Sequence, residues 1–478
     1  MSSLFFVNLC RVKKNDVATQ LQFCLTEIKT TVASPAPEVE TIASSMVKAE
    51  STEVHSRVHY VTTEASQWVP SGFLCLLADF AQAIGFFEVI QDVIQLPSKE
   101  VHYTNLEKTK TLIAMIASGC QHIKDINHRL RPYPALAHSF GMEQFPEQSQ
   151  INRLLHSFSG HLGQLDQLFE TLLRTYGLCQ RQQKVNLDFD STGLVVYGNT
   201  FELCRKGYFS RCRGSKGYQL SLGYTFGYPH SEILSLHLDP GNFYPGARFW
   251  DAIYQAAEIL GSLERLGIIR ADGAQGSGPN LEGLIELDRE FVIKGYSPQT
   301  ARIFARDIRF EQWEPVDLFT RVADLGLRKI TNCRPLVHVV LVETLNPRRW
   351  EMDYFNLFTH LKSPMSAPEI FDFYNARQNI EALIKGEKYG LHITPMKTRS
   401  FAGNYAFLYF VAITFNLLSW FKHDVLKGTG LEHLGLYDLT SKLMQIPAQF
   451  QVNNNQLELA FPNQHPMIKQ LDQPPAAD

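Results

Sequence analysis

The chain has 478 residues, of which 45% are hydrophobic and 19% charged, and its formal net charge is −3 at pH 7. A chain of this length is longer than one hydrophobic core usually organises, so we expect about two to four domains. The composition is that of an ordinary globular protein with a sizeable core, which excludes a chain that is disordered throughout. The nearly neutral net charge does not by itself favour a protein that binds nucleic acid.

The average charge hides two basic segments. The first, residues 201–218, has one acid, Glu202, and the second is residues 377–399. Their basic residues are Arg205, Lys206, Arg211, Arg213 and Lys216 in the first segment and Arg377, Lys385, Lys388, Lys397 and Arg399 in the second. Local basic stripes determine phosphate binding more than the sum over a chain does. The alternative interpretation is that both are solvated basic faces.

Cysteine use and apolar runs indicate a cytoplasmic protein with no membrane span. The eight cysteines form no C-x-x-C pair, so we expect reduced thiols. The N-terminus has a short apolar run without a basic region before it, which argues against a secretory signal. Residues 401–420 are long enough to span a bilayer, but Asn404 and Asn416 interrupt them. We therefore predict a buried core helix there.

The first part of the chain changes from weakly patterned to helical. Residues 1–66 are polar, and their role is unknown. Residues 67–180 have helical apolar spacing and are predicted to form a helical DNA-binding domain. Within them, FPEQSQINRLLHSF predicts a helix that fits a DNA groove, or else an all-α packing module. The polar residues of this helix are Gln148, Gln150, Asn152 and Arg153.

From about residue 181 the pattern alternates between strands and helices. Residues 181–297 predict three strands, a helix, a strand, a helix and a strand, which is the ribonuclease-H-like order. A β-rich insertion follows at 298–365. The core resumes at 366–425 with a helix over 368–388, and residues 426–478 predict a helix, a hairpin and a tail. The expected fold is α/β (α+β): a ribonuclease-H-like mixed sheet flanked by helices, interrupted by this insertion and preceded by an all-α domain.

Carboxylates stand on two of these predicted strands. In VNLDFDST, Asp188 and Asp190 are two residues apart and project from the same face of the strand. In IIRADGA, Asp272 ends a second strand just before a glycine, where the backbone is open to an approaching phosphate. Either Asp188 or Asp190 is a candidate for a metal ligand beside Asp272.

The helix predicted at 368–388 presents four polar residues on one stripe, with offsets of 3, 4 and 7. They are Tyr374, Arg377, Glu381 and Lys388. Carboxylates from two strands and a facing helix suit two-metal phosphoryl transfer, in which Mg²⁺ keeps open positions for water and phosphate oxygens. Arginine and lysine near the glutamate would clamp neighbouring phosphates.

The spacing Y-x2-R-x3-E-x6-K resembles the signature of insertion-sequence cut-and-paste transposases of the Asp-Asp-Glu (DDE) superfamily, in the group with a β-rich insertion before the catalytic Glu. VNLDFDST is similar to that group's first-aspartate strand, which favours Asp190 over Asp188. HLDPGN is similar to its turn after the third strand, IIRADGAQGSG to its second-aspartate strand, and FAGNYAFLYFVAITFNLL to the apolar helix after the Glu. The resemblance runs from about residue 67 to 463.

This resemblance implies roles for individual residues. Asp190, Asp272 and Glu381 would be the catalytic trio that binds two Mg²⁺ ions, with Mn²⁺ able to substitute. The residues that would contact phosphates of the transposon end are Tyr374, Arg377 and Lys388. An aromatic residue of the insertion would stack on a flipped base. Trp350 is the candidate, with Arg348 and Arg349 beside it for the backbone; Trp313 competes, and the alternative for Trp350 is a core anchor of the insertion.

The resemblance also implies a function. We expect a DNA transposase that binds terminal inverted repeats, cleaves both strands and joins the ends to target DNA. Its partners would be double-stranded DNA, both transposon ends and target, and a second copy in a homodimeric synaptic complex. The expected location is the bacterial cytoplasm, in association with the nucleoid. The alternatives are a structure-specific metal-dependent nuclease on the same fold and a domesticated, non-catalytic DNA-binding protein.

Overall fold

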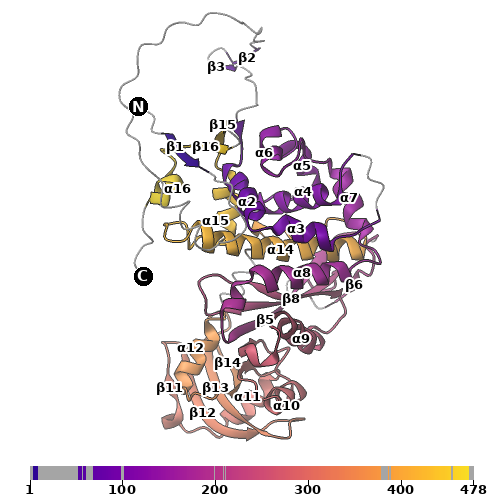
Figure 1. Ribbon diagram of the computed structural model, residues 1–478. Coiled ribbons are helices and arrows are strands. Elements are labelled where there is room, and N and C mark those ends of the chain that lie inside the picture. Colours follow the sequence, from indigo (N-terminus) through magenta and orange to yellow (C-terminus); the bar gives the residue numbers. More distant parts are fainter. Residues whose placement is uncertain are drawn as a thin grey trace, which may run out of the picture.

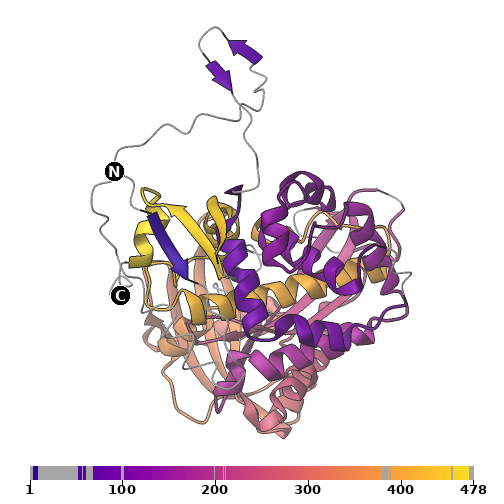
Figure 2. The same cartoon turned by 45° about the horizontal axis from the view of Figure 1, so that its top comes forward.

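The computed structural model describes residues 4–8, 52–55, 58–60, 68–97, 102–198, 200–207, 209, 212–377, 386, 389–453 and 456–472. A layer of helices lies over one large sheet, and the long helix α14 (Phe401–Val425) runs through this layer (Figure 1). The turned view in Figure 2 shows the same layers with the C-terminal hairpin beside the helices. Of the catalytic residues predicted from the sequence, Asp190 lies in this sheet and Asp272 directly follows one of its strands, whereas Glu381 lies outside the described residues.

The helical layer is built from residues 72–176. Its helices are α2 (Gly72–Ala83), α3 (Phe86–Val93), α4 (Asn105–Ala117), α5 (Ile126–Arg129), α6 (Pro134–Ser139), α7 (Gln148–Ser157) and α8 (Gly163–Tyr176). Helix α4 begins at a capping box, in which the Thr104 hydroxyl accepts from the Glu107 amide and the Glu107 carboxylate accepts from the Thr104 amide. Helices α4, α7 and α8 all pack on α14, which makes α14 the centre of this layer.

Helix α14 is the apolar helix predicted at 401–420. By length and composition it is the one helix in the described part of the chain able to cross a membrane, or one of two if the bent pair α2 and α3 counts as one span, yet 83% of its most apolar window is buried inside the protein. Asn416 bonds both the amide and the carbonyl of Ile233, at 2.8 and 3.0 Å. The side-chain oxygen of Asn404 accepts hydrogen bonds from two backbone amides just before the start of α14. The two asparagines thus join a core helix to its neighbours.

A small sheet connects the chain's two ends. Its strand order is β1 (Leu4–Asn8), β16 (Gln456–Pro462), β15 (Ala448–Asn453) and β4 (Trp68–Val69). Strands β15 and β16 form the hairpin predicted within residues 426–478, and β1 pairs antiparallel with β16. Two further strands, β2 (Thr52–His55) and β3 (Val58–Tyr60), pair with each other. The helices of this region are α15 (Leu436–Ser441) and α16 (Pro466–Lys469).

The large sheet has ten strands. Along its path they are β11 (Glu314–Pro315), β12 (Thr320–Lys329), β13 (Leu336–Asn346), β14 (Glu351–His360), β10 (Phe291–Lys294), β9 (Leu266–Ala271), β5 (Val185–Val196), β7 (Lys216–Phe226) and β6 (Arg205–Lys206), with β8 (Ile233–Pro240) also paired to β7. Strands β5, β7 and β8 are antiparallel, whereas β5, β9 and β10 are parallel. This confirms the predicted mixed sheet flanked by helices, and the order β8-β7-β5-β9-β10 is consistent with the ribonuclease-H-like arrangement.

Helices cover the sheet and are joined by short turns. The remaining α-helices are α9 (Phe249–Leu260), α10 (Gly278–Glu286), α11 (Pro298–Ala305) and α12 (Ala367–Asn375). The 3-10 turns are η2 (Ile123–Asp125), η3 (Leu178–Arg181), η4 (Pro245–Arg248), η5 (Leu263–Arg265), η6 (Phe310–Gln312), η7 (Leu443–Gln445) and η8 (Gln470–Asp472). Helix α9 buries its apolar stripe on β8 and β7 and contacts α8 on its other side.

The segment predicted as a β-rich insertion, residues 298–365, extends the large sheet. Its last strand, β14, pairs antiparallel with β10, from Phe291 opposite His360 to Lys294 opposite Leu357. Strands β13, β12 and β11 then extend the same sheet outward. A second, smaller core of buried residues from β10, β12, β13, β14 and α12 lies on one face of this extension. The predicted insertion begins with the helix α11. Because β14 pairs with β10 and β10 pairs with β9, its strands belong to the same hydrogen-bonded sheet as the strands beside the aspartates.

Candidate active site

The first two predicted aspartates meet on neighbouring parallel strands. The register of β5 and β9 places Asp188 opposite Arg270 and Phe189 opposite Ala271. One residue further on, Asp190 faces Asp272, which directly follows β9. The two side chains are close enough for the charge of Asp272 to raise the pKa of Asp190. Residues that are 82 positions apart in sequence thus come together where β9 ends beside β5, in the interior of the sheet.

The turn after β9 holds the Asp272 carboxylate in place. Its Oδ1 accepts from the Ala274 amide at 2.9 Å, and the fully buried Gln275 side chain donates to the same carboxylate when its amide nitrogen faces it. Gly276 passes so close to β10 that a Cβ there would lie 1.9 Å from the Lys294 carbonyl oxygen. Only glycine fits at that position, so Gly276 fixes the turn that follows Asp272 against the sheet.

Asp190 lies in a buried, charged environment. Burial raises the pKa of Asp190 most, the Arg377 guanidinium lowers it, and the Asp272 carboxylate raises it, with a net shift above the ordinary range. Arg377 Nη2 lies 3.1 Å from Asp190 Oδ1 and donates to the Phe189 carbonyl at 3.0 Å. One cation thus faces two carboxylates, which leaves an excess of negative charge among these side chains.

Asp188 is held by a different arginine. Arg270 Nε and Nη2 donate to its two oxygens at 2.7 and 2.6 Å, and the two side chains are 3–4% exposed. The Arg270 guanidinium also lies 3.6 Å from the ring centroid of Phe226 and donates to the Phe373 carbonyl. Because Arg270 engages both oxygens of Asp188, the arrangement favours Asp190 as the metal ligand and Asp188 as a brace between the strands.

The helix expected over 368–388 begins as predicted, since α12 starts at Ala367, but the described part of it ends earlier than the predicted end. Helix α12 ends at Asn375, and Arg377 lies in the turn that follows. The Arg377 amide donates a hydrogen bond to the Tyr374 carbonyl at 2.9 Å. The buried pairing with Asp190 and the Phe189 carbonyl holds the Arg377 side chain. Glu381 and Lys388 lie outside the described residues. Among the four residues of the signature, the structure therefore places Tyr374 and Arg377 beside the aspartates.

The donor set suits a divalent cation. Asp190 and Asp272 offer carboxylate oxygens, which are the ligands that Mg²⁺ and Mn²⁺ prefer. Two carboxylates side by side in a buried site repel each other, and a cation between them removes that cost. The Arg377 Nε is buried and has no hydrogen-bond partner among the described residues. No group of three His, Cys, Asp or Glu side chains in the described chain is placed to hold a metal, and Glu381 is the predicted third ligand.

Trp350 lies in the turn of the hairpin between β13 and β14. Its side chain is 79% exposed, and its backbone is left-handed, with φ +53°. The Trp350 amide donates a hydrogen bond to the Asn346 carbonyl, which holds this conformation. Arg348 is exposed beside it, whereas Arg349 pairs with Asp353 at 2.6 Å. Trp350 is therefore not a core anchor. A bulky residue rarely adopts positive φ, and such strain collects at functional positions.

Trp313, the competing aromatic, is half-buried. The Arg321 guanidinium lies 4.8 Å from its ring, and its side chain packs against the main core. Its ring is thus engaged within the insertion. Of the two tryptophans, Trp350 alone offers an exposed ring face for stacking.

Two other predicted DNA contacts lie at the surface. In the first basic segment, Arg205, Lys206, Arg213 and Lys216 are exposed at the edge formed by β6 and β7, where Lys206 stands opposite Lys216. In α7, the apolar residues Ile151, Leu154 and Leu155 are buried, and the helix packs on α4 and α14. Helix α7 therefore serves core packing, while its polar face, with Arg153 exposed, remains available to a partner.

Three structural side chains were missed by reasoning from the sequence. Arg270, Gln275 and Glu232 are all at most 3% exposed. Glu232 accepts from the Leu178 and Cys179 amides and from Trp420 Nε1, at 2.6–2.8 Å, and so joins η3 to α14. A charged residue within an otherwise apolar strand, as in IIRADGA, is the signal that points to Arg270, because such a charge must find a buried partner.

Comparison with known proteins finds a family model that matches part of the chain. Residues 340–475 match the family model described as transposase DDE domain group 1. This match supports a DDE transposase. The matched range runs from β13 to the C-terminal end and includes Arg377 and the predicted Glu381, but neither Asp190 nor Asp272. No curated protein matches the chain at a significant level.

Among solved structures, the chain is similar to a Drosophila P element transposase in a strand transfer complex. The identity is 12%, the alignment covers 44% of this chain and 45% of that chain, and the TM-score is 0.23. This chain thus spans less than half the length of that transposase. A likeness at this TM-score carries no argument, so the fold rests on the chain's own sheet topology.

Proposed function

We propose that this protein is a DNA transposase that binds terminal inverted repeats, cuts both strands and joins the cut ends to target DNA. One observation carries the proposal: Asp190 and Asp272 face each other on adjacent parallel strands, with the Arg377 guanidinium beside them. The DDE domain match over residues 340–475 supports the same conclusion. In this proposal it acts in the bacterial cytoplasm at the nucleoid, as a homodimer that pairs two ends.

The proposed chemistry is metal-dependent phosphoryl transfer. The Asp190 and Asp272 carboxylates would hold divalent cations, with Glu381 as third ligand. Two bound Mg²⁺ ions would supply activation of the attacking oxygen and stabilisation of the leaving oxygen. Gln275 and the Ala274 amide orient Asp272, and the Asp188–Arg270 pair braces β5 against β9. Arg377 limits the repulsion between the carboxylates, and its unpartnered Nε is a donor for a phosphate oxygen.

The site stands between two surfaces suited to DNA. The exposed edge of β6 and β7 carries the basic residues of the first segment, and Trp350 stands at the outer end of the β13–β14 hairpin. Phosphate contacts from basic side chains position DNA without reading sequence, and an aromatic face stabilises an unstacked base. Tyr374 and Lys388 are proposed as further contacts to the transposon end, as are Arg348 and Arg349 at the hairpin.

The test of this function is a cleavage and joining assay with the full-length protein. Purified protein, Mg²⁺, and a duplex that contains the inverted repeat flanking the gene should give double-strand breaks at the end and joined products with target DNA. A duplex of the same composition without the repeat is the matched control. Cleavage of branched DNA without joining would instead identify a structure-specific nuclease, and binding without cleavage a non-catalytic DNA-binding protein.

Replacing Trp350 with Gly is expected to lower DNA cleavage by about tenfold without loss of stability. Base–aromatic stacking contributes about 1–3 kcal/mol, and this contribution disappears with the ring. Glycine accepts positive φ at no steric cost, so the free energy of unfolding should be unchanged or slightly higher. Urea unfolding and the rate of cleavage are the two measurements.

The control for this substitution is Trp350→Phe, which keeps an aromatic face and should retain most of the cleavage rate. If Trp350→Gly and Trp350→Phe cleave at the wild-type rate, Trp350 has no stacking role. If Trp350→Gly unfolds at a much lower urea concentration, the ring is structural after all.

A further inference from the structure

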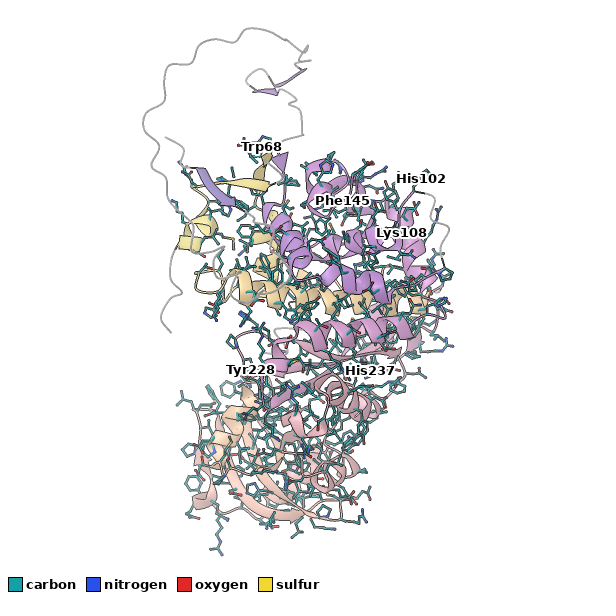
Figure 3. All side chains as sticks on the ribbon, viewed as in Figure 1. Trp68, His102, Lys108, Phe145, Tyr228 and His237 are labelled. Atoms are coloured by element: carbon teal, nitrogen blue, oxygen red, sulfur yellow. The ribbon has the colours of Figure 1, made fainter. Side chains whose placement is uncertain are left out.

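A cavity of about 110 Å³ lies in the helical layer, away from the aspartates. It is lined by Pro70, Ser71, Ser118, His128, Arg129, Leu130, Tyr133 and Gln445. Trp68, three residues before Ser71, is labelled in Figure 3 at the edge of the helical layer on the side away from the large sheet. The cavity therefore belongs to the helical layer and to none of the residues of the proposed active site.

Ser71 gives this cavity a hydroxyl for which the described residues show no hydrogen bond. It is 3% exposed and is the N-cap residue of α2, a helix of 12 residues, but its side chain makes no capping hydrogen bond. The described structure gives its hydroxyl no other hydrogen bond. An N-cap serine usually accepts from the first helical turn, so a hydroxyl that lines a cavity instead is available to a ligand. The partial positive charge of the helix N-terminus adds to the same place.

Arg129 supplies a full positive charge. Its guanidinium donates to the Gly119 and Ser118 carbonyl oxygens at 3.2 and 3.1 Å and to Gln445 Oε1 at 2.7 Å. All three acceptors are neutral, and they hold the side chain in one orientation. An arginine has five N–H donors, so two remain for a further acceptor.

Two more donors line the cavity wall. His128 is exposed at its rim, and Tyr133 is half-buried. No carboxylate is among the lining residues, whereas one cavity elsewhere in the described chain includes Glu232 and another includes four acidic residues. A site with hydroxyls, an arginine, a histidine and a helix N-terminus, and without an acid, has the chemistry that recognises an oxyanion.

We propose that this cavity binds one phosphate group, held by Arg129, the Ser71 and Tyr133 hydroxyls and the N-terminus of α2. A volume of about 110 Å³ holds a small polyatomic anion but excludes a nucleotide base beside it. Two sources have this chemistry: a backbone phosphate of duplex DNA and free inorganic phosphate. The DNA source rests on the proposed function, whereas the phosphate-binding chemistry does not.

The test uses the full-length protein and the double variant Ser71→Ala/Tyr133→Phe. Neither substitution removes a hydrogen bond seen in the protein, so the variant should fold with a melting temperature close to that of the wild type. Inorganic phosphate should raise the wild-type melting temperature in a saturable manner, beyond the effect of chloride at equal ionic strength. In the double variant the apparent affinity for phosphate should fall about tenfold, because two hydrogen bonds to an anion are lost.

The matched control is Ser363→Ala/Tyr437→Phe, which removes the same two hydroxyls from exposed positions elsewhere. It should respond to phosphate as the wild type does, since the general stabilising effect of phosphate on proteins acts through the whole surface. Equal responses of the wild type and the cavity variant would overturn the proposal, as would a wild-type response no larger than that to chloride.

A second measurement separates the two sources. If the cavity holds a backbone phosphate, the cavity variant should bind duplex DNA about tenfold more weakly, with and without the inverted repeat, because backbone contacts carry no sequence information. If DNA binding is unchanged while the phosphate response is lost, the cavity takes free phosphate. A protein that responds to phosphate but neither cleaves nor joins DNA would disprove the proposed function and leave the phosphate site standing.

Discussion

Asp190→Asn is expected to lower DNA cleavage by about 10³-fold or more while the protein remains folded. Asparagine keeps the shape of the side chain but removes the charge that would hold a divalent cation. The transition-state stabilisation lost with a metal ion amounts to several kcal/mol, and each 1.36 kcal/mol corresponds to tenfold in rate. Asp272→Asn should have the same effect, since the two carboxylates share one place. The measurement is the cleavage rate of an end-containing duplex in Mg²⁺.

Thermal unfolding adds a second measurement to this prediction. The net shift raises the pKa of Asp190 in the folded protein, so its ionised form costs stability at neutral pH, and this cost disappears in the asparagine variant. Without metal, the melting temperature should therefore not fall by more than roughly a few degrees. Mg²⁺ should raise the melting temperature of the wild type and much less that of Asp190→Asn.

The control for both measurements is Asp92→Asn, in which an exposed carboxylate of α3 is neutralised far from the sheet. It should cleave DNA and respond to Mg²⁺ as the wild type does. Cleavage by Asp190→Asn at the wild-type rate would show that Asp190 is not a catalytic ligand, whatever its position.

The largest effect on stability is expected from Asp188. Asp188→Ala should lower the free energy of unfolding by about 3–5 kcal/mol, because it leaves the Arg270 guanidinium buried without its carboxylate. The double variant Asp188→Leu/Arg270→Met should recover most of this loss, since apolar side chains of similar size often replace a buried ion pair without cost. Urea unfolding of the wild type, both single variants and the double variant gives the coupling between the two residues.

A surface pair provides the comparison. Asp251→Ala removes one partner of the exposed pair with Arg248 and should change the unfolding free energy by less than about 1 kcal/mol. The double variant at 188 and 270 also tests the choice between the two aspartates of β5. If it folds, cleaves DNA and responds to Mg²⁺, Asp188 is structural. If it folds but has lost both the Mg²⁺ response and cleavage, Asp188 belongs to the metal site.

The meeting of Asp190 and Asp272 could be predicted because local patterns encode it. Alternation along VNLDFDST assigns the face of each carboxylate, and the strand that ends at IIRADGA has to lie parallel beside it once an intervening helix covers the sheet. The buried helix α14 was equally readable, since its asparagines are too polar for a bilayer span yet too few for a surface helix.

The rest depends on contacts that no local pattern contains. Arg377 was expected on a helical stripe, but it turns toward the Phe189 carbonyl, 188 residues away in sequence, and the described helix stops at Asn375. Arg270, 82 residues away in sequence, binds Asp188. This contact distinguishes Asp188 from Asp190, although the alternating pattern puts both carboxylates on the same face of the strand. The exposure of Trp350 also depends on how the hairpin extends from the sheet, which composition does not determine.

The pairing of β14 with β10 makes the predicted insertion an integral part of the large sheet. If residues 298–365 were excised and the chain rejoined, β10 would become the last strand of the sheet, with the backbone amides and carbonyls of Phe291 to Lys294 unsatisfied on one side. Such an open margin invites a strand from a neighbouring molecule, so a shortened protein would aggregate. Homologous chains with a smaller insertion would need another way to cover this margin.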